Sequence, residues 1–150
     1  MARILPKNKI KPLFIGFGSQ ALEYAKVLEN LNVRIKSVCV TNLKKNNEKL
    51  NKFKIEHRYN DIKKALKDKK YNLVFVFLPW NIIEKKIIDI IKNTKKKIYC
   101  EKPIALSLKN LKKISNISKK YNKNLYILYN RRYYKNYSII KKKNTKKYKI

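Results

Sequence analysis

The chain has 150 residues, a length that suits one domain and allows a buried core of its own. The formal net charge is +31, because 40 lysines and arginines face only 9 aspartates and glutamates. No apolar run reaches the roughly 18 residues of a membrane-spanning helix, so we predict no membrane span.

The first patterned stretch follows a basic leader over residues 1–11, which lacks the apolar core of a signal peptide. The apolar run Leu13–Ile15 predicts a strand. A glycine turn comes next, and apolar residues at helical spacing predict a helix over Ser19–Leu31, with Ser19 as a candidate N-cap.

Strand and helix patterns then alternate as far as residue 129. Further strands are predicted over Arg34–Val40, Ile55–Tyr59, Leu73–Leu78, Lys97–Cys100 and Leu125–Tyr129. Further helices are predicted over Lys44–Phe53, from a cap at Asn60 or Asp61 through Lys67, over Ile82–Lys92, and from Ser107 onward. We therefore predict that residues 12–130 form a Rossmann-like α/β domain, a doubly wound parallel sheet of about six strands in the order 3-2-1-4-5-6, with helices on both faces.

Two of the helices carry a clear apolar stripe, which predicts the face that each turns to the sheet. The stripes are Ile83, Ile87, Ile90 and Ile91 in one helix, and Leu108, Leu111, Ile114 and Ile117 in the other. Cys39 and Cys100 fall on strands that are separated by two others, about 14 Å apart and too far to bridge, so both are predicted to be buried thiols of a reducing cytoplasm. His57 is predicted to be a surface or edge residue.

The glycine turn has the pattern Gly-x-Gly-x-x-Ala, from Gly16 to Ala21. In such a turn the first glycine permits a tight bend, the second lets the backbone approach a pyrophosphate, and the small third residue allows close packing of helix on strand. The free N–H groups at the helix start attract phosphate. The turn therefore predicts a dinucleotide site, although the pattern alone also fits an ordinary strand-to-helix turn.

Three further motifs follow the turn: Leu78-Pro79, then Tyr99-Cys100-Glu101-Lys102-Pro103, then Tyr129-Asn130-Arg131-Arg132-Tyr133. With these motifs in this order, the chain resembles the N-terminal half of the Gfo/Idh/MocA family of glucose–fructose oxidoreductases and inositol dehydrogenases. The resemblance covers residues 12 to about 134, and Glu-Lys-Pro is its most specific part. It implies NAD(P)-dependent hydride transfer to or from a sugar, cyclitol or nucleotide-sugar.

The resemblance also implies roles for particular residues. Glu101 is expected near the nicotinamide ribose, and Lys102 is expected to contact the substrate hydroxyl, help to move its proton and act as the catalytic residue. Pro103 is either a cis-proline or a strand stop. No metal site is predicted, and the expected cofactor-binding residues are Gly16, Phe17, Gly18, Ser19, Gln20, Thr41, Asn42, Lys44, Leu78, Pro79, Trp80, Glu101, Lys102 and Arg131.

The choice between NAD and NADP depends on the end of the second strand, where an acidic residue commonly accepts the ribose 2′-hydroxyl of NAD. Here Thr41-Asn42 is followed by Lys44-Lys45, so no carboxylate would repel a 2′-phosphate. This slightly favours NADP. Trp80 either stacks near the cofactor or closes the edge of the sheet.

The family also has a C-terminal substrate domain, for which no sequence is present here. Residues 131–150 are rich in lysine and tyrosine and are expected to be partly disordered, or a helix on the sheet. We therefore expect a cofactor-binding part that is incomplete as an enzyme and that needs a separate chain with the substrate domain, or a homo-oligomer. The alternatives are a pseudoenzyme and a basic protein that binds polyanions.

The polyanion alternative draws on the net charge, but the details of the composition weaken it. Only five of the basic residues are arginines, the better bidentate ligands of phosphate, and the lysines are spread over almost every segment. We therefore predict no more than non-specific attraction to nucleic acid at low salt.

Overall fold

The computed structural model describes residues 10–68, 70–122 and 124–134. The strands are β1 (Pro12–Ile15), β2 (Ser37–Cys39), β3 (His57–Tyr59), β4 (Leu73–Val76), β5 (Lys97–Cys100) and β6 (Leu125–Ile127). The helices are α1 (Ser19–Asn30), α2 (Leu43–Lys52), α3 (Ile62–Lys67), α4 (Trp80–Asn93) and α5 (Leu108–Tyr121), followed by the 3-10 helix η2 (Asn130–Tyr133). Most of the tail predicted over residues 131–150 lies outside the described residues.

All six strands are parallel and form one sheet in the order β3-β2-β1-β4-β5-β6, which confirms the predicted topology. Several strands are shorter than predicted. The prediction was too long because apolar residues such as Val40 and Phe77 stay buried after the regular strand has ended. Both residues still donate backbone hydrogen bonds to the neighbouring strand, to Tyr59 O at 2.9 Å and to Ile15 O at 2.8 Å.

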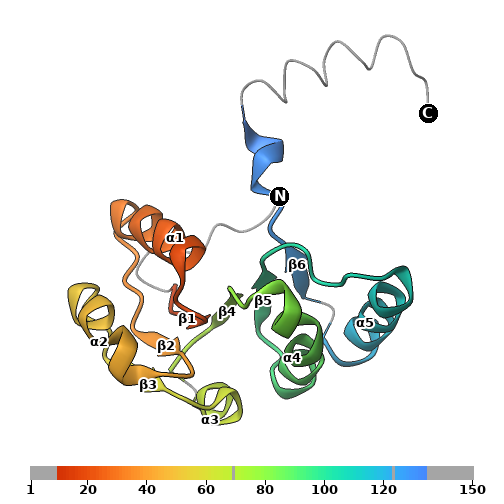
Figure 1. The fold of residues 1–150 in the computed structure, drawn as a ribbon, viewed down its shortest axis with the longest axis horizontal. Coiled ribbons are helices and arrows are strands. Elements are labelled where there is room, and N and C mark those ends of the chain that lie inside the picture. The colour runs from red at the N-terminus through yellow and green to blue at the C-terminus, as the bar shows by residue number, and fades with distance from the viewer. Residues whose placement is uncertain (1–9, 69, 123, 135–150) are drawn as a thin grey trace.

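Each face of the sheet has its own hydrophobic core (Figure 1). One cluster joins Phe14 and Val38 of the sheet to Ala21 and Ala25 of α1 and to Leu50 of α2. The other joins the sheet to α3, α4 and α5, and it contains the isoleucines predicted to face inward from α4: Ile83, Ile87, Ile90 and Ile91. Two helices on one face and three on the other make a doubly wound domain.

Helix α5 differs from its prediction. Ile114 is buried, but Leu108 is 66% exposed and Leu111 is 45% exposed, so the predicted inward positions of these two leucines are wrong. The helix packs on α4 and follows the edge of the sheet, where β6 has no further strand beside it in the described chain. The apolar stripe is therefore longer than the surface that covers it.

The helix starts are set by short side chains in three cases. Asn42, Asp61 and Ser107 each accept a hydrogen bond from a backbone N–H three residues later, at 2.9, 2.8 and 3.2 Å. Asp61, rather than Asn60, is thus the cap of α3. The predicted cap of α1 is wrong: Gly18 is the N-cap and Ser19 is the first helical residue, so no side chain caps this helix.

The two cysteines are buried and free, as predicted. Burial, with a smaller contribution from Asp61, raises the pKa of the Cys39 thiol to about 11. Burial and then Glu101 raise the pKa of Cys100 to about 12. Both groups therefore stay protonated at neutral pH, which disfavours nucleophilic or metal-binding roles that need a thiolate.

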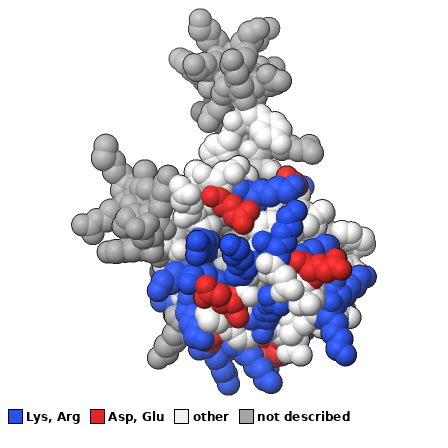
Figure 2. Space-filling model, turned by 90° about the vertical axis from the view of Figure 1, so that its left-hand side faces the viewer, with Lys and Arg blue, Asp and Glu red and all other residues white. Residues whose placement is uncertain are grey.

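Basic side chains are spread over the face of the molecule shown in Figure 2, and acidic side chains lie among them. This arrangement differs from the continuous basic stripe that is typical of a nucleic-acid interface. In the described residues no helix is long and apolar enough to cross a membrane.

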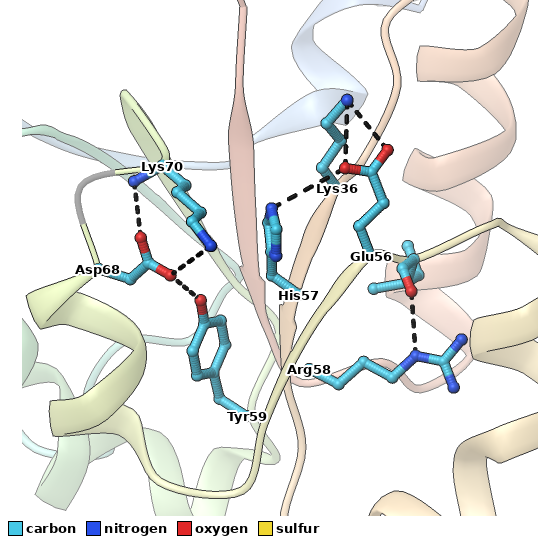
Figure 3. Close-up of polar contacts among 8 residues, drawn as sticks. Lys36, Glu56, His57, Arg58, Tyr59, Asp68 and Lys70 are labelled. Carbon is cyan, nitrogen blue, oxygen red and sulfur yellow. Dashed lines mark hydrogen bonds and ion pairs between the residues drawn. The ribbon is translucent and has the colours of Figure 1, made fainter.

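His57 begins β3, an edge strand, as predicted. Its Nε2 lies 3.9 Å from one carboxylate oxygen of Glu56, and the other oxygen of Glu56 lies 2.9 Å from Lys36 Nζ (Figure 3). Nearby, the hydroxyl of Tyr59 donates a hydrogen bond to Asp68, which lies 3.9 Å from Lys70 Nζ. These contacts tie the strand β3 to the segments before β2 and β4.

Candidate functional site

A cleft of about 690 Å³ lies at the carboxyl ends of the strands. Its lining includes Ile15 at the end of β1, Cys39 at the end of β2, Phe77 after β4 and Glu101 after β5. This volume is within the range of small-molecule and cofactor sites. The cleft spans the boundary between β1 and β4, where the strand order reverses, and doubly wound sheets bind ligands at that position.

Gly16 makes the turn out of β1. Its backbone has φ +91°, and its N–H donates a hydrogen bond to the carbonyl of Cys39 at 2.8 Å. A Cβ atom at this position would lie 2.4 Å from the carbonyl oxygen of Phe77, far closer than van der Waals contact. Only glycine fits here, so this residue sets the shape of the turn.

Gly18 has a different role. Its φ of −82° is accessible to any residue, and no atom lies within 4 Å of the position that a Cβ would take. The space above it belongs to the cleft, which Ser19, Gln20 and Ala21 also line. The first turn of α1 has neither a side-chain cap nor an acidic residue, so its backbone N–H groups and the positive end of the helix dipole are left for an anion.

The end of β2 forms the side of the cleft nearest to α2. Thr41, Asn42, Lys45 and Lys49 line it, and no aspartate or glutamate does so at this end. The Asn42 side chain is engaged, because its oxygen accepts the hydrogen bond from the Lys45 N–H. Lys44, the lysine expected from sequence, is exposed and does not line the cleft, so the two cations on this side are Lys45 and Lys49.

The Glu-Lys-Pro segment follows β5. Glu101 donates its backbone N–H to Val76 O at 2.9 Å, and its side chain is 14% exposed. One carboxylate oxygen lies 3.8 Å from Lys102 Nζ, while the other is buried without a hydrogen-bond partner among the described residues. The Lys102–Pro103 peptide bond is cis, which decides the alternative that the sequence left open for Pro103.

Tyr24 was not identified from sequence. It lies one helical turn after Gln20 on α1, and its ring contacts Phe77 with 5.1 Å between the centroids. Burial raises the pKa of its hydroxyl, and the nearby charge of Glu101 raises it further. Tyr24 does not line the cleft, and its ring contributes to the packing of α1 on the sheet.

The structure brings most of the expected cofactor residues together in one cleft. The residues that line it are Gly16, Phe17, Gly18, Ser19, Gln20, Thr41, Asn42, Leu78, Pro79 and Glu101. Trp80 begins α4, is 60% exposed and does not line the cleft. Lys102 does not line it either, although its Nζ lies 3.8 Å from the Glu101 carboxylate. The side chain of Arg131 lies outside what the structure describes.

Residues 10–129 match the sequence profile of the Gfo/Idh/MocA family, described as an oxidoreductase family with an NAD-binding Rossmann fold. The chain belongs to this family. Its matched part is the NAD-binding Rossmann-fold domain of an oxidoreductase. A search of curated proteins found no match.

Solved structures with the same fold include three dehydrogenases. The WlbA dehydrogenase from Chromobacterium violaceum, in complex with NADH and UDP-GlcNAcA, has a TM-score of 0.83 and 16% identity over 96% of this chain. The myo-inositol dehydrogenase from Lactobacillus casei, in complex with NAD(H) and myo-inositol, has a TM-score of 0.81 and 23% identity over 91% of this chain. A probable dehydrogenase from Thermotoga maritima has a TM-score of 0.80 and 23% identity over 91% of this chain. This chain spans 41% of the length of each of them.

Proposed function

We propose that this chain binds a nicotinamide dinucleotide in the cleft and supplies the cofactor half of an oxidoreductase that acts on a sugar, cyclitol or nucleotide-sugar. The observation that carries the proposal is the open space above Gly18, next to the uncapped start of α1. The N–H groups of Ser19 and Gln20 would bind the pyrophosphate, which then needs no basic side chain. Two dehydrogenases with this fold are in complex with UDP-GlcNAcA and with myo-inositol, and these ligands indicate the substrate class.

When bound, the nicotinamide ring would accept or give the hydride. Glu101, at the carboxyl end of β5, would hold the ribose next to this ring, since its unpartnered carboxylate oxygen can accept a hydroxyl hydrogen bond. Lys102 would pass a proton to or from the substrate oxygen as the hydride moves. Lys102 Nζ lies 3.8 Å from a carboxylate oxygen of Glu101, and an ammonium group at this position would donate its proton to a carbonyl oxygen in the reductive direction.

The rest of the active site would come from elsewhere. The dehydrogenases with this fold are more than twice as long as this chain, and hydride transfer needs a substrate that is held in place and shielded from water. We propose that this part is contributed by further sequence, by a separate chain, or by a second copy of this one.

NADP is the proposed cofactor rather than NAD. Lys45 and Lys49 line the side of the cleft at the end of β2, where no carboxylate would repel a 2′-phosphate. We expect NADPH to bind at least about tenfold more tightly than NADH, the size of effect that one or two partly solvated charge pairs provide.

Changing Lys45 and Lys49 together to glutamate tests both the site and the preference. The double change should weaken the binding of NADPH at least about tenfold and leave the affinity for NADH within about threefold of the original, because only NADPH carries the 2′-phosphate. Cofactor fluorescence, titrated with the protein at physiological salt, measures both affinities. The matched control is Lys44→Glu with Lys52→Glu, two exposed lysines on the same helix that do not line the cleft. Equal weakening by the two pairs would show general charge attraction instead of a site, and no response to either cofactor would contradict the proposed function.

A further inference from the structure

A second feature lies at the opposite end of the sheet from β3, away from the glycine turn. An apolar groove of about 380 Å³ runs between α5 and the edge strand β6. Ile104, Leu111, Ile114, Leu125 and Ile127 form its apolar walls. Ser115 and Ser118 also line it, and their small side chains leave open a space that larger residues would fill.

The strand next to this groove has a free edge. The carbonyl of Asn124 accepts a hydrogen bond from Ile98 at 2.8 Å, and the N–H of Leu128 donates one to Cys100 at 2.9 Å. Because backbone groups alternate along a strand, those of Leu125 and the N–H of Ile127 point away from β5. In the described part of the chain no strand pairs with them, and such an edge can accept an added strand.

In the described residues no helix covers the other face of β6. The ring of Tyr126 is 44% exposed and stacks on Tyr99 at 5.3 Å, and Tyr99 in turn stacks on Phe75 at 5.3 Å. Parallel strands are normally covered on both faces. A strand added beside β6 would therefore meet apolar surface on both sides, the groove on one and the tyrosine ring on the other.

The helix beside the groove carries charge of one sign. Helix α5 carries five lysines and no acidic residue, and the sequence has no aspartate or glutamate after Glu101. Lys119 lines the groove, and Lys112, seven residues earlier, shares its side of the helix. An occupant with carboxylates would be complementary to this rim.

We propose that the β6 edge and the α5–β6 groove bind an extended acidic segment of a partner protein. The segment adds a seventh strand, places two apolar side chains in the groove and one on Tyr126, and brings its carboxylates to Lys112 and Lys119. A second copy of this chain is disfavoured because each copy has a net charge of +31. Residues 135–150 are disfavoured because they contain lysines and no acidic residue.

The test uses a fluorescein-labelled peptide, Asp-Glu-Val-Phe-Val-Glu-Asp, and fluorescence anisotropy at about 0.15 M salt, where long-range attraction is screened. A peptide of the same composition, Val-Asp-Glu-Phe-Asp-Glu-Val, no longer has two apolar residues two positions apart on one face, and it should bind at least about tenfold more weakly. Ser115→Phe fills the groove from an exposed helix position, and Lys112→Glu with Lys119→Glu reverses the rim. Each of these variants should bind the first peptide at least about tenfold more weakly.

The matched control is Lys63→Glu with Lys67→Glu, the same change of charge at exposed positions of α3. It should leave binding within about twofold, since these lysines are remote from the groove. Equal weakening by both double variants, or equal binding of the two peptides, would show general attraction to acidic chains and overturn the proposal. Sedimentation would also overturn it if the unliganded protein were a dimer that Ser115→Phe dissociates.

Discussion

Replacing Gly16 with alanine should lower the free energy of unfolding by about 3 kcal/mol or more, enough to unfold much of a marginally stable domain. Two costs add at this position. The backbone has φ +91°, which strains any residue that has a Cβ, and the new Cβ would overlap the Phe77 carbonyl oxygen 2.4 Å away. Because that carbonyl belongs to the chain leaving β4, relief would require β1 and β4 to move apart.

Denaturant unfolding followed by circular dichroism measures the effect. Gly18→Ala is the matched control, since its φ is −82° and no atom lies within 4 Å of the new methyl group. It should change stability by no more than about 1 kcal/mol. Similar losses for the two substitutions would contradict the division of roles between the two glycines.

Replacing Gly18 with aspartate should lower the affinity for the dinucleotide by a factor of about 100 or more, while the fold is retained. Aspartate is a preferred N-cap, so its carboxylate would accept hydrogen bonds from the N–H groups at the start of α1 and would, if anything, stabilise the helix. The same carboxylate would occupy the space above residue 18 and place a negative charge where the pyrophosphate should lie.

Gly18→Asn separates occupancy from charge, because asparagine caps a helix equally well and is neutral. We expect its affinity to lie between those of the original chain and Gly18→Asp. The binding of NADPH, followed by its fluorescence, gives the comparison, and thermal melting shows that both variants are folded. If Gly18→Asp bound NADPH normally, the pyrophosphate would not lie at the start of α1.

The strand order and the two covered faces of the sheet could be predicted from sequence, because strands that alternate with helices have few permitted connections. The positions of Leu108 and Leu111 could not. Helical spacing shows that they share a stripe with Ile114, but not that α5 follows the edge of the sheet, where too little surface remains to cover the stripe. Burial at an edge depends on what lies beside it, and a local pattern does not contain that information.

The candidate site shows the same division. The glycine turn and Glu101 were predicted, because each motif requires particular residue types. The lysines at the end of β2 were predicted only in part: of Lys44 and Lys45 only Lys45 lines the cleft, and Lys49 lines it as well. Neighbouring helix positions differ by about 100°, so a helix start shifted by one residue changes which lysine faces the ligand.

The most direct test of the glycine turn as a pyrophosphate site is the mapping of backbone amide chemical shifts during titration with NADPH. We expect the largest changes at Gly18, Ser19 and Gln20, smaller ones at Thr41 and Glu101, and little change in α5. Changes scattered over the exposed lysines, with the amides of the turn unmoved, would contradict the assignment of this cleft to a dinucleotide.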